Sequence, residues 1–522
     1  MEMDKRTLIA IILSIAILVG YQYFFIKPVP PKPVTEQAKT AQGEEKKQEA
    51  VKPVSVLPSM PAVPSGEKEI KVETDLYSAI FSSAGGTIKK WELKKYKDKD
   101  GMAVLLQKGR GVVPPLAVGP QNNFSLSNAN FRVLGKDINL DKNSKTGSVV
   151  FEYAAPEYAI RRTYTFYYDS YKFDLKDEIT GFPEYWITLG ADFGLHDRKD
   201  ESAHLGPVIL KDADRIELDA KKLKEGKSYQ GGLKWIAQED KYFFAAVVPV
   251  TPMDEAKAWK VQDASVVAFK GKPGINDFIV YAGPKEHDKL KELNLGLEHI
   301  IDFGFFSIIS RPLFWLLKKF YAVAGNYGWA IILLTIITRI PFIPLINKSQ
   351  QSMKKMQDIQ PKMAEIKEKY KKDPQKMQKE TMELYKKYKV NPLGGCLPML
   401  LQIPVFFALY KILSIAIELR GAPFMLWITD LSAPDTLFGQ AAGFSLGGPL
   451  PYLMGITMVI QQKMTPSTMD PKQAKLMMFM PIIFTFMFLN FASGLVLYWL
   501  VNNILSIIQQ FYVNKKLAKE TA

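Results

Sequence analysis

An arginine inside an apolar stretch is the feature that most limits what this chain can fold into. Residues 327–346 read YGWAIILLTIITRIPFIPLI and are long enough to cross a bilayer as a helix. Arg339 would lie ~18 Å beyond Tyr327, in the cytoplasmic half of a ~30 Å hydrocarbon core. A charge at that depth costs roughly 2.5–3.5 kcal/mol, so it persists where it faces protein or water and has a role. Thr335 shares its helix face, which predicts a polar, cationic face inside the membrane.

The same arginine has a simpler explanation, which the residues alone leave open. Its guanidinium could pair with a backbone carbonyl or extend towards the cytoplasmic surface. The general cost of intramembrane charge favours the functional reading.

Composition argues against catalytic and metal chemistry. The single cysteine, Cys396, allows no intrachain disulfide and no thiolate cluster. No HExxH motif and no phosphate-binding loop appear in the sequence. We therefore expect no enzyme activity, no cofactor and no metal. The net charge of +15 lies mostly beside apolar spans, so it indicates membrane topology and not specific nucleic-acid binding. The four histidines are scattered: His196, His204, His287 and His299.

The N-terminal 66 residues predict an anchor followed by a linker. Lys5 and Arg6 precede an apolar span that ends in aromatic residues and lacks a small-residue cleavage site. This pattern is typical of an uncleaved signal anchor, so residues 1–26 are expected to span the membrane with the N-terminus in the cytoplasm. Residues 27–66, rich in Pro, Lys, Glu, Gln and Ala, predict a disordered periplasmic linker.

Residues 67–295 predict an all-β domain in the periplasm. Tyr171, Phe173 and Leu175 alternate with charged residues, which is the pattern of a half-buried strand. Gly85-Gly86 marks a turn between two further strand candidates. About 230 residues of strands and turns fit one large sandwich.

Residues 296–522 predict an α-helical membrane block. Segment 348–390 carries thirteen lysines and six acidic residues, whereas 418–448 carries one arginine and three acidic residues. Because positively charged loops stay in the cytoplasm, six spans in total are expected, with both termini inside. The block contains an interfacial helix at 311–324 and five spans at about 327–347, 396–417, 449–464, 473–490 and 493–513.

The lysine-rich segment 348–390 predicts a cytoplasmic helical hairpin. Apolar residues recur there at three- and four-residue spacing, and Asp373-Pro374 supplies a cap and a first-turn proline. Its methionines are either ordinary core or a flexible surface for varied apolar partners, and the sequence favours neither. Its lysines also suit anionic headgroups.

Three long segments of the membrane block resemble the YidC/Oxa/Alb family of membrane protein insertases. The resemblance extends to the whole order of segments, from the anchor to a five-helix core with a hairpin after its first span. A large periplasmic domain is typical of the Gram-negative form, where it resembles a carbohydrate-binding supersandwich. Here GGLKWIAQEDKYFFAAVVP carries a looser match, without evident sugar-contact residues. The three segments are TIITRIPFIPLINKSQQSMKKMQDIQPKM, NPLGGCLPMLLQIPVFFALY and FMPIIFTFMFLNFASGLVLYWLVNNILSIIQQ.

This resemblance implies a hydrophilic groove among the five core spans, open to the cytoplasm and to lipid. Arg339 and Thr335 match the groove arginine and the threonine before it. Tyr498 and Trp499 match the aromatic pair that contacts the passing segment. The resemblance also suggests polar lining by Gln402, Gln462 and Asn502 or Asn503, and apolar substrate contact by Leu400, Ile403 and Phe406.

The function implied is that of an insertase and chaperone of the bacterial inner membrane. It would insert and help fold integral membrane proteins, with lipoproteins as a further candidate class, alone or with the Sec translocon. The implied partners are nascent membrane proteins, the Sec translocon with its SecDF-type accessory subunits, the ribosome through the cytoplasmic loops, and membrane lipids.

Two other classes explain part of the sequence. A polytopic transporter would also hold a charge inside its bundle, but the five core spans lack inverted repeats and paired broken helices. An envelope protein with a sugar- or lipid-binding periplasmic domain would need the membrane block only as an anchor. Five spans with an intramembrane arginine exceed that need.

Overall fold

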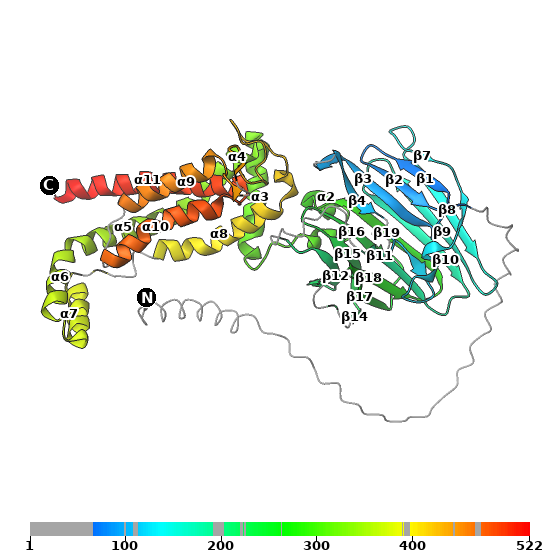
Figure 1. The fold of residues 1–522 in the computed structure, drawn as a ribbon, viewed down its shortest axis with the longest axis horizontal. Coiled ribbons are helices and arrows are strands. Elements are labelled where there is room, and N and C mark those ends of the chain that lie inside the picture. Colours follow the sequence, from blue (N-terminus) through cyan, green and yellow to red (C-terminus); the bar gives the residue numbers. More distant parts are fainter. Residues whose placement is uncertain are drawn as a thin grey trace, which may run out of the picture. The chain divides into compact units, whose positions relative to one another are not determined.

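The computed structural model describes most of the chain from residue 66 onward. Along this part, strands predominate up to residue 284 and helices predominate after it, as Figure 1 shows. The predicted anchor, the linker up to residue 65 and Cys396 lie outside the described residues. The described ranges are 66–98, 101–107, 113–191, 203–219, 223, 226–262, 264–388, 390, 397–441, 444–464 and 471–521.

The strands of the β domain form three sheets, in which all neighbours are antiparallel except the parallel pair β1 and β7, and a small fourth sheet in the helical block pairs β20 (Gln440–Ala441) with β21 (Phe444–Ser445). The nine-stranded sheet has the order β13 (Asp214–Glu217), β12 (Gly206–Lys211), β15 (Leu233–Glu239), β16 (Phe243–Pro249), β19 (Gly274–Pro284), β10 (Lys172–Thr180), β9 (Ala159–Tyr167), β8 (Thr146–Ala154), β6 (Arg132–Leu134). One five-stranded sheet has the order β4 (Gly101–Gln107), β3 (Thr87–Asp98), β2 (Tyr77–Ser82), β1 (Glu69–Glu73), β7 (Ile138–Asn139). The other has the order β14 (Lys227–Gln230), β17 (Glu255–Val261), β18 (Ala264–Gly271), β11 (Tyr185–Ala191), β5 (Val118–Gly119).

Strand β10 confirms the strand predicted from alternation. Phe173 and Leu175 are buried on one face, while the neighbouring Lys172 and Asp174 are only half-buried. The turn predicted at Gly85-Gly86 joins β2 to β3, and both glycines have positive φ, a conformation that glycine adopts without a Cβ clash.

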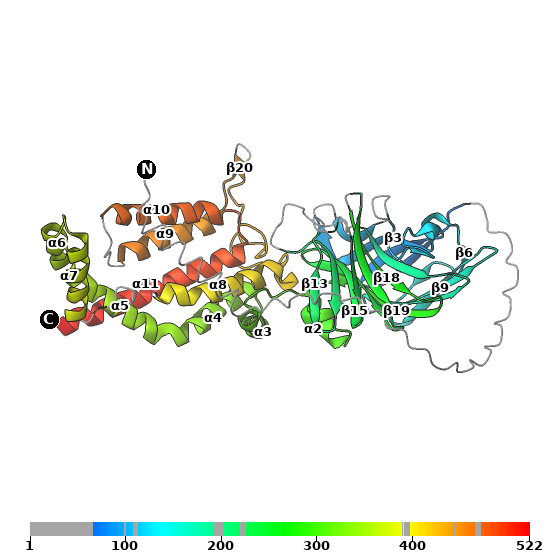
Figure 2. The same ribbon diagram turned by 90° about the horizontal axis from the view of Figure 1, so that it is seen from below.

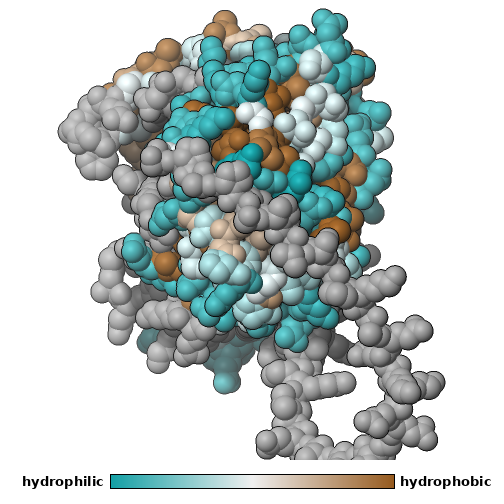
Figure 3. Space-filling view, turned by 90° about the vertical axis from the view of Figure 1, so that its right-hand side faces the viewer, coloured by the Kyte–Doolittle hydropathy of each residue, from teal (hydrophilic) through white to brown (hydrophobic). Residues whose placement is uncertain are grey.

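The nine-stranded sheet packs against both smaller sheets, and a buried ion pair ties these layers together. Arg162 on β9 and Asp177 on β10 are both fully buried, with Nε donating to Oδ1 at 2.9 Å. The Arg162 guanidinium also donates to the carbonyl oxygens of Gly86 at 3.2 Å and Leu116 at 2.6 Å. A buried charge is tolerated when it is paired and hydrogen-bonded, as this one is. Hydrophilic residues cover much of the face of the β domain seen in Figure 3, with smaller hydrophobic patches between them.

Helices make up most of the remaining described chain, and the longer ones lie side by side in Figures 1 and 2. α11 lies against α4, α5, α8 and α9, and α10 lies against α9. The helices are α2 (His287–Glu292), α3 (Ser307–Ala324), α4 (Tyr327–Arg339), α5 (Ile343–Asp358), α6 (Gln360–Lys369), α7 (Pro374–Lys387), α8 (Leu397–Ile415), α9 (Pro449–Met464), α10 (Pro471–Phe488) and α11 (Ser493–Thr521).

The helical block exposes large apolar side chains on several helices. Phe479 and Phe486 on α10 are 60% and 63% exposed, and Ile456 on α9 is 56% exposed. Faces of this kind are costly in water and suit contact with lipid. Two of the described helical segments, Tyr327–Asp358 and Ser493–Lys515, are both long and apolar enough to cross a membrane. A helix occupies each of the five predicted core spans.

The helix in the first predicted core span is interrupted directly after Arg339. A 3-10 turn, η4 (Ile340–Phe342), separates α4 from α5, and it contains Pro341, which lacks the N–H of a regular helix. Arg339 is therefore the last residue of α4. The carbonyl end of a helix carries a partial negative charge, which favours a cation at this position.

The lysine-rich segment 348–390 forms helices with their own small core. α5 continues to Asp358, so the hairpin proper consists of α6 and α7 and begins later than the predicted residue 348. Asp373 caps α7 by accepting a hydrogen bond from the backbone N–H of Lys376 at 3.0 Å, as its place before Pro374 predicted. Met356 on α5 and Met363 on α6 are buried in this small core, which favours ordinary packing for these two methionines.

Candidate functional site

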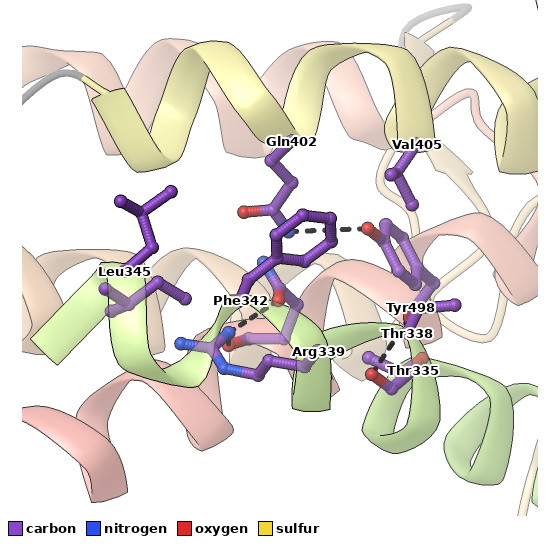
Figure 4. A pocket seen from close by; sticks show the side chains of 10 residues that line it. Thr335, Thr338, Arg339, Phe342, Leu345, Gln402, Val405 and Tyr498 are labelled. Atoms are coloured by element: carbon purple, nitrogen blue, oxygen red, sulfur yellow. Dashed lines mark hydrogen bonds between the residues drawn. The ribbon is translucent and has the colours of Figure 1, made fainter.

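A small cavity lies where α4, η4, α5, α8 and α11 meet, and Figure 4 shows it from close by. Its volume is about 30 Å³, enough for about two water molecules. Both polar and apolar side chains surround it. The lining residues are Thr335, Thr338, Arg339, Phe342, Leu345, Ile346, Gln402, Val405, Tyr498 and Asn502.

Arg339 is the one charged residue among the lining residues of this cavity. Its Nη1 donates to the carbonyl oxygen of Asn502 at 3.1 Å and to Oδ1 of Asn502 at 2.7 Å. Its Nε and Nη2 both donate to Oε1 of Gln509, at 3.3 and 3.1 Å. These acceptors are neutral, and no carboxylate hydrogen-bonds to Arg339 in the described part of the chain. The guanidinium therefore brings a positive charge to the cavity that no acidic side chain there compensates.

Gln509 is a site residue that the sequence reasoning missed. Its Nε2 donates to Oδ1 of Asn347 at 2.7 Å and to the carbonyl oxygen of Ile343 at 3.3 Å, both on α5. A signal was present, because Asn502, Ser506 and Gln509 recur at helical spacing in an otherwise apolar span. That polar stripe marks the face of α11 that Arg339 contacts.

The two threonines of α4 bond to their own helix. Thr335 is buried, and its hydroxyl donates to the carbonyl oxygen of Ile331 at 2.7 Å. The hydroxyl of Thr338 donates to the carbonyl oxygen of Leu334 at 2.8 Å. Such hydroxyls give the cavity wall a small polar surface without an unsatisfied donor.

One polar contact joins α8 to α11 across the cavity. Gln402 Nε2 donates to the hydroxyl of Tyr498 at 3.4 Å, and Figure 4 shows Gln402 and Val405 pointing from α8 into the site. Tyr498 is 3% exposed. The bond is long, so it holds these helices together only weakly.

Other predicted site residues are not among the residues that line the cavity. The Trp499 ring packs edge-on against Phe406 at 4.9 Å and near Phe488 at 5.3 Å, in an aromatic cluster between α8, α10 and α11. Ile403 on α8 is 38% exposed. Gln462 lies on α9 and is not a lining residue of this cavity. Leu400 lies on α8, and its side chain is outside the described residues.

The cavity offers charge and hydrogen bonds but no group suited to covalent chemistry or metal binding. Within the described ranges, no three His, Cys, Asp or Glu side chains gather in a way that could hold a metal ion. What the arrangement can do is bind polar and anionic groups next to apolar helix faces. A helical block with lipid-suited surfaces and a half-buried cationic site, together with a β-sandwich domain, is the architecture of an integral membrane protein.

Comparison with known proteins gives the family. Residues 69–316 match the family described as YidC periplasmic domain, and residues 319–520 match the family described as 60Kd inner membrane protein. The membrane protein insertase YidC of Pelobacter propionicus is 43% identical over 545 residues, covering 98% of this chain and 99% of that protein. That of Syntrophus aciditrophicus is 40% identical over 557 residues, covering 98% of this chain and 100% of that protein.

A solved structure of an active YidC insertase, with its first transmembrane domain resolved, is 20% identical and covers 86% of this chain and 94% of its own, with a TM-score of 0.40. The chain belongs to the YidC family of membrane protein insertases. It is an inner membrane protein with a β-rich periplasmic domain and a helical C-terminal region, and it is an insertase and not an enzyme. The transporter and envelope-binding alternatives are thereby set aside.

Proposed function

We propose that this insertase moves the polar flank of a nascent membrane protein past the site at Arg339. The observation that carries the proposal is the guanidinium itself, which lines a cavity between helices and bonds to neutral oxygens of Asn502 and Gln509. Because the described residues supply it with no carboxylate, Arg339 can attract acidic groups of a substrate.

Such a site is needed because removing water from the polar flank of a substrate is costly. A polar flank crossing hydrocarbon loses the water that solvates its backbone and charges. Water and a fixed cation part-way into the bilayer shorten the apolar distance that the flank must cross. A cavity of about 30 Å³ holds water and not a polypeptide. Substrate binding therefore requires α8 and α11 to separate, which breaks the Gln402–Tyr498 hydrogen bond.

While the polar flank passes Arg339, apolar residues beside the cavity would bind the hydrophobic segment of the nascent protein. Ile403, Phe406 and Trp499 lie on α8 and α11, next to the polar site, and Leu400 precedes them on α8. The segment then moves into lipid because leaving water is favourable by about 25 cal/mol per Å² of apolar surface. The scheme uses no nucleotide. Gln462 keeps its proposed role as polar lining of the wider, substrate-bound groove.

The rest of the functional scheme is also proposed. The chain would cross the membrane six times with both termini in the cytoplasm, and α3 would lie at the periplasmic interface. The lysine-rich helices α6 and α7 would face the ribosome and anionic headgroups. The Sec translocon with its SecDF-type subunits would be a partner for part of the substrates.

The test replaces Arg339 by Ala and by Lys in cells depleted of the native protein. Insertion of a model protein with an acidic flank should fall in Arg339→Ala and recover in Arg339→Lys, which retains the charge. Arg311→Ala is the matched control, because Arg311 is an exposed arginine on α3. Photocrosslinkers at positions 498 and 499 should capture the stalled nascent chain. Full insertion in Arg339→Ala would refute the proposal.

A further inference from the structure

Gln509 occupies the edge of Arg339 that a substrate carboxylate would use. The Nε and Nη2 atoms form the edge of a guanidinium that binds carboxylates in a bidentate manner. In this structure one neutral oxygen, Oε1 of Gln509, accepts from both atoms, at 3.3 and 3.1 Å. Charge-assisted bonds to a carboxylate are shorter, about 2.7–2.9 Å, and roughly twice as strong. A carboxylate can therefore displace Gln509.

The orientation of Gln509 is fixed from its other side. Its amide nitrogen donates to Asn347 Oδ1 at 2.7 Å and to the Ile343 carbonyl oxygen at 3.3 Å, so the amide oxygen is turned towards Arg339. The Arg339–Asn502 bonds hold the remaining side of the guanidinium through Nη1. Four of its five N–H groups are thus directed by protein oxygens on α11.

We propose that Gln509 is a positioning and specificity-determining residue of the insertion site. It holds the guanidinium in place with a neutral acceptor, which leaves the positive charge available. Substrate carboxylates exchange with Oε1, whereas uncharged polar flanks compete with it poorly. Gln509 thereby sets the preference of the site for acidic flanks. This inference rests on the proposed role of Arg339.

Two substitutions at this position separate charge from shape. Gln509→Glu keeps the shape and the acceptor but places a carboxylate on the bidentate edge, which neutralises the guanidinium. Gln509→Met keeps a similar volume and removes both the acceptor and the amide donor, while the charge of Arg339 remains. The two substrates are model proteins that differ only in Asp or Asn residues in the translocated flank. The measured quantity is the ratio of their insertion yields.

We expect Gln509→Glu to lower the Asp-to-Asn insertion ratio by about tenfold, the effect of losing one hydrogen bond to a charged group. Gln509→Met should lower the ratio less than Gln509→Glu does, and by raising the yield of the Asn substrate, because neutral flanks then meet no competing oxygen at Arg339. Asn514→Asp is the charge control, since it adds a carboxylate on the same helix and does not hydrogen-bond to Arg339 in the described structure. It should leave the ratio unchanged.

If Gln509 only stabilised the fold, Gln509→Met would impair insertion more than Gln509→Glu. The reason is that Met removes every hydrogen bond of Gln509, whereas Glu retains the acceptor. An equal loss for both substrates, or an unchanged ratio in Gln509→Glu, would overturn the inference. The Arg339→Ala protein is measured in parallel. If it inserts both substrates fully, the proposed function fails as well; if it loses the Asp substrate while Gln509→Glu does not, only the role of Gln509 is refuted.

Discussion

Arg339 at the end of α4 is joined to Asn502 on α11 by two hydrogen bonds, to its carbonyl oxygen at 3.1 Å and to its Oδ1 at 2.7 Å. The two residues lie 163 positions apart in the sequence. One bond uses the backbone and survives any substitution of Asn502, whereas the shorter bond depends on its side chain. This difference allows the contribution of the side chain to be measured.

Asn502→Ala should therefore remove the side-chain hydrogen bond that orients the Arg339 guanidinium, without unfolding the helical block. A hydrogen bond to a charged group contributes ~1.5–3 kcal/mol, so we expect a loss of about ten- to a hundredfold in insertion of acidic-flank substrates. The readout is protease protection of the translocated flank in membrane vesicles.

The neighbouring asparagine provides the control for this substitution. Asn503 Nδ2 donates to Thr457 Oγ1 on α9 at 3.2 Å, away from Arg339. Asn503→Ala should remove ~0.6 kcal/mol of helix–helix stabilisation and leave the preference for acidic flanks intact. Equal insertion defects in both proteins would contradict the assignment of Asn502.

The buried ion pair of the β domain predicts a large loss of stability. Asp177→Ala leaves the fully buried guanidinium of Arg162 without its carboxylate, which costs ~3–5 kcal/mol in comparable cases. Thermal unfolding of the purified full-length protein, followed by limited proteolysis of the β domain, measures the effect.

The adjacent pair on the same two strands is the matched control. Arg161 and Glu178 are 51% and 37% exposed, with 3.8 Å between Nε and Oε2. Glu178→Ala should change the unfolding temperature little, because exposed pairs contribute ~0–1 kcal/mol. A comparable fall in both proteins would argue against burial as the cause.

Glu73 on β1 predicts a pH-dependent contribution to stability. Burial raises the pKa of its carboxyl, but bonds from Lys71, Lys94 and Ser78 outweigh this and lower the pKa from 4.5 to about 2. Because the folded pKa lies below the unfolded one, the stabilisation is complete above pH 4.5 and is lost as the pH falls towards 2.

Glu73→Gln should accordingly unfold more easily than the unmodified protein at pH 7, and the difference should close on acidification. The side chain of Glu73 is 25% exposed, so we expect ~1–2 kcal/mol and not the full value of the pKa shift. Glu69→Gln, whose carboxylate is 46% exposed, should show little of this pH dependence. A gap between Glu73→Gln and the unmodified protein that persists below pH 3 would contradict this origin.

A close approach of α9 and α10 predicts a packing defect. A Cβ atom on Gly455 would lie 2.0 Å from Oγ1 of Thr485, so these helices touch where glycine leaves room. Gly455→Leu should separate them and cost ~1–3 kcal/mol through overpacking. Trypsin resistance of the detergent-solubilised protein should fall. Ile456→Ala, next to it but 56% exposed, should behave like the unmodified protein.

Several features could be predicted from the sequence because they depend on local patterns. Alternation marked β10, glycine pairing marked the β2–β3 turn, and Asp373-Pro374 marked the start of α7. A charge inside an apolar span pointed to Arg339 as the centre of a site, since only a protein or water environment tolerates it there.

The partners of that charge could not be predicted in the same way. Which polar residues of α11 face Arg339 depends on how two helices far apart in sequence are rotated against each other, and this is set by the packing of many side chains. The sequence suggested Gln462 and passed over Gln509 and Asn347 for this reason. It likewise could not show that Trp499 packs among phenylalanines while Tyr498, its neighbour, reaches the cavity.

The sequence by itself determined the division into a β domain and a helical block, and the strand and helix patterns within each. It also determined the presence of a cation that lipid alone would not tolerate. Tertiary structure decided which oxygens surround that cation, how small the cavity is, and which aromatic ring borders it. The physical reason is the sequence distance over which each effect acts. Hydrophobic periodicity and the cost of a charge in lipid depend on one segment alone. The direction of a hydrogen bond depends on where a second helix, far away in the sequence, places its acceptor.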